Sequence, residues 1–130
     1  MALIRKEFGH TFLYVANVGD TRAVLNKNGV CERMSQDHKA TDFNEVQRIK
    51  GGGGIVLENR VGGSLAVTRA FGDHALKRDG VTAKPFINKH ALRPFDKHLI
   101  IASDGVWDVL EDQDAVNFCK DELSSKDIAQ

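Results

Sequence analysis

Short stretches of alternating apolar and polar residues, separated by glycine-containing turns, fill the first third of the chain. This alternation predicts β-strands that each bury one face. The expected strands are residues 2–6, 11–18, 21–25 and 30–34, with turns at 8–10, 19–20 and 26–29. The regular spacing of the turns is typical of an antiparallel meander.

The pattern then changes to a helical one. Asp42 precedes Glu45 by three residues, which is the spacing of a capping box with Asp in the place of Ser or Thr. Phe43, Val46 and Ile49 recur on one face, and the helix is expected to end at Gly51. The four glycines at 51–54 favour a mobile hinge, since no nucleotide-binding pattern follows them.

The rest of the chain mixes short apolar segments with loops and helices. We expect short apolar segments at 55–57, 60–61 and 65–67, a loop at 74–80, an edge strand within 81–87, a central strand at 98–102, an amphipathic helix at 112–122 and a last helix capped by Ser124 or Ser125 that runs to Gln130. The expected fold class is α+β with antiparallel sheet. A helix that starts so near residue 130 suggests that the chain stops before the domain does.

The segment from Leu99 to Asp108 is the most informative part of the sequence. The apolar run 99–102 predicts a strand buried on both faces, and Ser103-Asp104-Gly105 follows it directly. Gly105 permits a tight turn after Asp104. A carboxylate held at the end of a strand suits Mg²⁺ or Mn²⁺, but Asp104 could equally cap the backbone that follows it. Both interpretations stay open on these residues alone.

Composition narrows the class of protein. With 130 residues, 42% of them hydrophobic and 28% charged, the chain is expected to be one globular domain at most. Eighteen basic residues balance 18 acidic ones without a basic cluster, which argues against binding to nucleic acid or to an anionic membrane. Cys31 and Cys119 fit no zinc spacing, so we expect reduced, buried thiols. Neither a membrane span nor a signal peptide is expected, which favours a cytoplasmic protein, although a nuclear one is also compatible.

Five segments, in order, resemble motifs of the metal-dependent type 2C (PPM) serine/threonine protein phosphatases. They are Leu13-Tyr14-Val15-Ala16-Asn17-Val18-Gly19-Asp20-Thr21-Arg22-Ala23-Val24, Met34-Ser35-Gln36-Asp37-His38-Lys39, residues 45–54, residues 63–73 and residues 101–109. The departures are small: Thr21 and Thr68 replace serines, Ala40 replaces a proline, and the glycine run has one extra residue.

The resemblance implies a β-sandwich of two antiparallel sheets flanked by helices, with a binuclear Mn²⁺ or Mg²⁺ site. The family's early D-G-H-G segment, its phosphate-binding arginine and its C-terminal D-N aspartate have no counterpart in residues 1–130. The chain is therefore expected to be a partial phosphatase domain, either a fragment or a truncated relative.

The resemblance also suggests site residues. Asp104 matches a metal ligand central to catalysis, and Asp20 matches an aspartate that holds a further, weaker metal in some relatives. Residues of about 39–61 match the substrate flap; the associated residues are His38, Gly51, Gly52, Gly53, Gly54 and Arg60, and those adjacent to the site are Arg69, Asp73 and Gly105. Structural roles stay open for many of them: an Asx turn for Asp20, a structural histidine at His38, and an ion pair or turn for Arg69 and Asp73. Trp107 is expected in the core.

The implied activity is hydrolysis of phosphoserine and phosphothreonine in a phosphoprotein substrate by a metal-activated water. One alternative is a catalytically inactive truncated relative that acts as a binding or regulatory module. Another is the pairing of half-domains, as a homodimer or with a missing half.

Overall fold

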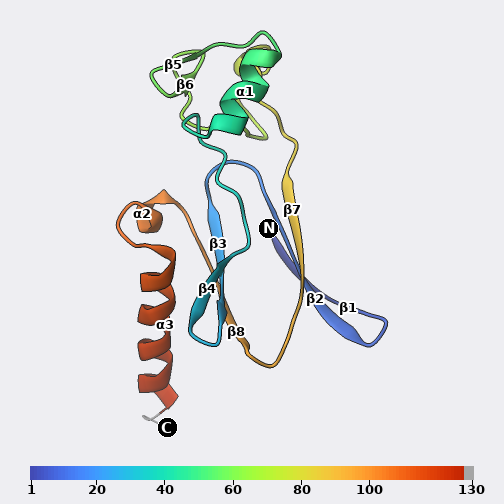
Figure 1. Ribbon diagram of the computed structural model, residues 1–130, viewed down its shortest axis with the longest axis vertical. Coiled ribbons are helices and arrows are strands. Elements are labelled where there is room, and N and C mark those ends of the chain that lie inside the picture. The colour runs from blue at the N-terminus through green and yellow to red at the C-terminus, as the bar shows by residue number, and fades with distance from the viewer. Residues whose placement is uncertain (128–130) are drawn as a thin grey trace. The chain divides into compact units, whose positions relative to one another are not determined.

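The computed structural model describes residues 1–127, with side chains described as far as residue 119, and the chain forms two compact units (Figure 1). Unit 1 comprises Met1–Ala16, Thr21–Ser35 and the chain from Ile87 onwards, and unit 2 comprises Asn17–Asp20 and Gln36–Phe86. No helix within residues 1–127 combines the length and the apolar character needed to cross a membrane.

Two three-stranded sheets carry the strands of the first third of the chain. One has the order β1-β2-β7, with β1 at Ala2–Glu7, β2 at His10–Asn17 and β7 at Phe86–Ala91. The other has the order β4-β3-β8, with β3 at Arg22–Lys27, β4 at Val30–Arg33 and β8 at Asp96–Ala102. The four early strands are confirmed. The meander is wrong, because β2 and β3 belong to different sheets, each beside a strand from much later in the chain.

The core of unit 1 lies between these sheets. Leu13 and Val15 of β2 form one buried cluster with Ala23 and Leu25 of β3 and with Met34. Burying each large apolar side chain of this kind contributes about 1.5–3 kcal/mol. Side chains of both sheets meet in this cluster, as the expected β-sandwich requires.

Helices cover the other face of β3. Val24 packs against Trp107, Ala115 and Val116, which come from α2 (Asp104–Trp107) and α3 (Asp112–Asp127). The Trp107 indole also donates to the carbonyl of Ala102 at 2.7 Å. The expected core role of Trp107 is confirmed.

Three expectations for the later part of the chain are wrong. The strand buried on both faces is β3 and not β8, which is an outer strand with Ile101 49% exposed. The edge strand expected within 81–87 starts only at Phe86, immediately after Pro85, whose missing N–H keeps it out of a ladder. A single helix, α3, replaces the two expected at the end, while the side chains of Ser124 and Ser125 and the position of Gln130 lie outside the described part.

Unit 2 is built around helix α1 (Phe43–Gly51). A hairpin of β5 (Val56–Leu57) and β6 (Arg60–Val61) follows, and a short 3-10 helix, η1 (His74–Leu76), interrupts the loop expected at 74–80. Its core contains Ala40, Ile49, Val61 and Val81.

The start of α1 agrees with the sequence, but its buried face does not. The backbone N–H of Glu45 donates to Asp42 Oδ1 at 2.9 Å, which confirms the N-cap. Phe43 is 72% exposed, so its place on the buried face is wrong. Glu45 is buried instead, at 3% exposure.

The glycine run continues the hydrogen bonding of α1, and its last residue, Gly54, is closely packed. The N–H groups of Gly52, Gly53 and Gly54 donate to carbonyls in the last turn of α1. A Cβ added at Gly54 would lie 2.2 Å from the carbonyl oxygen of Asp79, which is inside van der Waals contact. Glycine is therefore required at Gly54 by close packing.

Candidate functional site

Asp104 is the first residue of α2 and is exposed, in unit 1. The N–H groups of Val106 and Trp107 donate to the carbonyl of Ser103, at 3.1 and 3.4 Å, so the Asp104 side chain does not cap them. Within residues 1–127, no hydrogen bond or ion pair engages the Asp104 carboxylate. Gly105, the next residue, is also exposed. The carboxylate is thus available to a ligand.

Asp20 is half-buried and belongs to unit 2, where it follows Gly19 at a φ of 95°. The ammonium of Lys39 lies 3.9 Å from its Oδ2 atom. In the described part of the chain, the Asp20 carboxylate makes no hydrogen bond to its own turn, so it is not engaged in the Asx turn considered from the sequence.

The carbonyl oxygen of Gly19 collects three hydrogen-bond donors. The backbone N–H and the ring Nδ1 of His38 each lie 3.0 Å from it, and Asn17 Nδ2 lies at 3.4 Å. A carbonyl can only accept, so Nδ1 carries the ring proton and Nε2 has a lone pair. Asn17 also donates to the carbonyl of Gln36 at 2.6 Å. These contacts hold the turn that carries Asp20.

His38 itself is fully buried. Its Nε2 atom has no hydrogen-bond partner among the described residues. Burial lowers the pKa of the imidazole, and the positive charge of Arg69 lowers it further. A ring placed in this way has no surface with which to touch a substrate, which favours the structural role.

A buried ion cluster in unit 2 was not recognised from the sequence. The Glu45 carboxylate accepts two hydrogen bonds from Arg48, two from Arg69 and one from Thr68. Its side chain is 4% exposed. Burial alone would raise the pKa of Glu45, but the hydrogen bonds from Arg69, Arg48 and Thr68 outweigh burial and hold the pKa far below its usual value. Glu45 is therefore ionised at neutral pH.

Arg69 has its ion-pair partner in this cluster. The expected ion pair exists, but Arg69 binds Glu45, with Nη2 to Oε1 at 2.5 Å, and not the nearby Asp73. Asp73 is exposed and adopts a φ of 54° just before η1. The capping-box spacing predicts that Glu45 reaches back along its own helix, whereas in the structure its carboxylate also binds Arg69, on a later segment.

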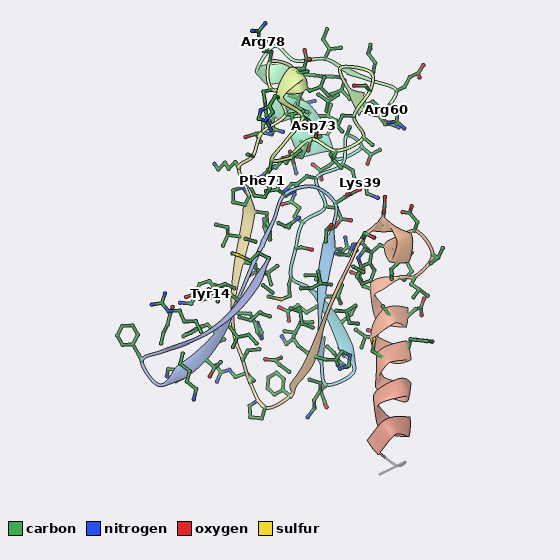
Figure 2. All side chains as sticks on the ribbon, turned by 180° about the vertical axis from the view of Figure 1, so that it is seen from behind. Tyr14, Lys39, Arg60, Phe71, Asp73 and Arg78 are labelled. Carbon is green, nitrogen blue, oxygen red and sulfur yellow. The ribbon has the colours of Figure 1, made fainter. Side chains whose placement is uncertain are left out.

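The β5–β6 hairpin of the expected flap lies on the surface of unit 2, although Val61 within it is buried. Arg60 is exposed and donates to the carbonyl of Ser64 at 2.8 Å, and Figure 2 shows it directed outwards, as is Arg78. Ile55 and Leu57, beside and within the β5–β6 hairpin, are 56% and 57% exposed. The hairpin thus presents apolar and basic groups to solvent.

Within residues 1–127, no three His, Cys, Asp or Glu side chains gather in a group that could hold a metal ion. A binuclear centre needs more carboxylates than single residues such as Asp20 and Asp104 provide. The described residues alone therefore do not fit a complete Mn²⁺ or Mg²⁺ centre.

Comparison with known proteins gives the family. The family model of protein phosphatase 2C matches residues 1–130. The chain belongs to the protein phosphatase 2C family. It is 48% identical over 109 residues to Protein phosphatase 2C homolog 1 of Saccharomyces cerevisiae, and 44% identical over 132 residues to the protein of the same name from Schizosaccharomyces pombe. These matches cover 84% and 99% of this chain but 38% of each relative.

Solved structures of the family agree with the fold. The crystal structure of serine-threonine phosphatase 2C from Toxoplasma gondii matches with a TM-score of 0.74 and 30% identity, over 89% of this chain and 43% of that one. The α+β fold expected from the sequence, a part of the protein phosphatase 2C sandwich, is confirmed.

Proposed function

We propose that this chain acts as part of a metal-dependent serine/threonine protein phosphatase, with Asp104 as a metal-binding carboxylate. The observation that carries the proposal is the exposed Asp104 side chain, in a segment that matches the family motif. No described residue makes a hydrogen bond or an ion pair with its carboxylate. A carboxylate without a competing partner can bind Mg²⁺ or Mn²⁺. The substrates would be phosphoserine and phosphothreonine in proteins.

The proposal includes a partial domain over residues 1–130 and a substrate flap at about 39–61. Support for the flap comes from the exposed β5–β6 hairpin, whose neighbouring helix α1 is held by the buried Glu45. We also propose a cytoplasmic location, which the two free cysteines, Cys31 and Cys119, support because reduced thiols persist in a reducing compartment.

A second candidate is a binding or regulatory module without catalysis. Exposed apolar residues of unit 2, such as Phe43 and Phe71 at 72% and 79% exposure, offer contact area for a protein partner. The two candidates differ in whether metal-dependent turnover exists.

Turnover of the isolated chain does not separate the two candidates, because hydrolysis of p-nitrophenyl phosphate with added Mn²⁺ should be negligible in both cases: the chain provides too few ligands. Metal binding at Asp104 tests the proposal instead. Calorimetric titration with Mn²⁺ should show weak binding that Asp104→Ala abolishes. Asp114→Ala, which removes an exposed carboxylate from the first turn of α3, is the matched control and should bind like the wild type. Binding that is unchanged in Asp104→Ala would exclude the proposed ligand.

A further inference from the structure

Asp20 depends on the peptide group that precedes it. Because a peptide group is planar, fixing the Gly19 carbonyl also fixes the N–H and the Cα of Asp20. Two of the three donors to that carbonyl come from one residue, His38, through its backbone and its ring. All of these residues belong to unit 2.

Placing a histidine ring at position 38 costs folding free energy. An imidazole that buries Nε2 without a partner carries a desolvation penalty that a leucine of similar size would avoid. Packing therefore does not explain why a histidine lies here. What the ring adds is the Nδ1–H donor to Gly19.

His38 is also held from its other side. Its carbonyl accepts from the N–H of Thr68 at 2.8 Å. The Thr68 hydroxyl lies 2.7 Å from Glu45 Oε2 and 3.2 Å from the same His38 carbonyl. The buried Glu45 cluster thus supports the segment from which His38 reaches Gly19.

We propose that His38 is a positioning residue: through Nδ1–H and the Gly19 carbonyl, it holds the Gly19–Asp20 peptide group, and with it the Cα from which the Asp20 side chain projects. The inference rests on the proposed function only in so far as Asp20 takes part in metal binding. The positioning itself is a property of unit 2 and can be measured without metal.

The test compares His38→Leu, which removes the ring donor, with His38→Asn, whose side-chain amide can place a donor close to the position of Nδ1. The measurements are the ¹³C shift of the Gly19 carbonyl and the ¹⁵N order parameter of Asp20 in the full chain. In His38→Leu the carbonyl signal should move upfield and the order parameter should fall from a rigid value of about 0.85 to below about 0.6. His38→Asn should stay near the wild type.

The Arg69 Nε–H signal, which reports the contact with Glu45, shows whether unit 2 is folded. Unchanged Gly19 and Asp20 signals in a folded His38→Leu variant would overturn the proposal. If His38→Leu does not fold, His38→Asn is compared with His38→Gln, whose longer side chain places its amide near the Nε2 position. The proposal is supported if the order parameter of Asp20 stays near the wild-type value in His38→Asn but falls in His38→Gln. Equal order parameters in the two variants overturn it.

Manganese separates this inference from the proposed function. Mn²⁺ should broaden the Asp20 signals of the wild type, and less so those of Asp20→Asn. If Mn²⁺ broadens neither, the metal role of Asp20 fails, while the order parameters still decide whether His38 positions it.

Discussion

Replacing Glu45 by glutamine should destabilise unit 2 strongly. The substitution keeps the shape of the side chain but removes the charge that Arg48 and Arg69 share. Breaking a buried ion pair by removing one partner costs about 3–5 kcal/mol. Arg69 is 15% exposed and would be left largely buried, whereas Arg48 is 33% exposed and can regain water. We therefore expect the lower end, about 3 kcal/mol, or roughly a 150-fold change in the unfolding equilibrium of unit 2.

The assay must report on unit 2. The sequence has one Trp and one Tyr, and both Trp107 and Tyr14 belong to unit 1, so intrinsic fluorescence does not follow unit 2. Amide hydrogen exchange in α1, which belongs to unit 2, follows the unfolding of this unit directly. Arg60→Gln, on the exposed hairpin, is the control and should change the free energy of unfolding by less than about 0.5 kcal/mol. A loss below about 1 kcal/mol in Glu45→Gln would refute the reasoning.

Acid provides a second check on Glu45. Because its folded pKa lies below the usual value of 4.5, its contribution to stability is complete above pH 4.5 and is lost as the pH falls towards the folded pKa. The difference between wild type and Glu45→Gln should therefore shrink by about 1.4 kcal/mol per pH unit below pH 4.5. A difference that stays constant from pH 7 to pH 3 would show that the carboxylate is not stabilised by its partners.

Three other predictions concern the packing at Gly54, the core at Trp107 and the association of the chain. Gly54→Ala should destabilise unit 2 by about 1–3 kcal/mol, measured by hydrogen exchange, because the added Cβ would meet the Asp79 carbonyl. The control Gly51→Ala has nothing within 4 Å of the added Cβ and should be neutral or stabilising, so equal effects of the two substitutions would contradict the close packing at Gly54. Trp107→Phe should cost unit 1 about 1–2 kcal/mol in denaturation followed by circular dichroism, since the hydrogen bond to Ala102 is lost; no change would contradict its role. Light scattering over a hundredfold concentration range should show association, since the outer strands of both sheets and apolar side chains such as Ile4, at 66% exposure, are open; a stable monomer would exclude it.

Local elements were predictable from the sequence because local rules create them. The turns before β2 and β4 and the Asp42 cap of α1 depend on neighbouring residues only. The assignment of strands to sheets was not predictable, because β2 and β3 join β7 and β8 across most of the chain. An apolar run such as 99–102 has the same composition in a central strand and in an outer strand that packs on one face.

The candidate site shows the same division. Asp20 and Asp104 could be proposed from the sequence because each follows a strand in a short, distinctive motif. Glu45 was misinterpreted because a glutamate at that position fits a capping box, and periodicity treats any charged residue as exposed. Besides Arg48 on the same helix, it binds Arg69, which is 24 residues away in the sequence, and only the fold brings these two charges together.

The discontinuous composition of unit 2 limits how the protein can be divided. Residues 36–86 are continuous, but the unit also includes Asn17–Asp20 from far upstream. These four residues include the Gly19 carbonyl to which His38 donates. A peptide of residues 36–86 would thus keep the two donors of His38 and lose their acceptor, so an isolated unit 2 would need a copy of residues 17–20 tethered to it.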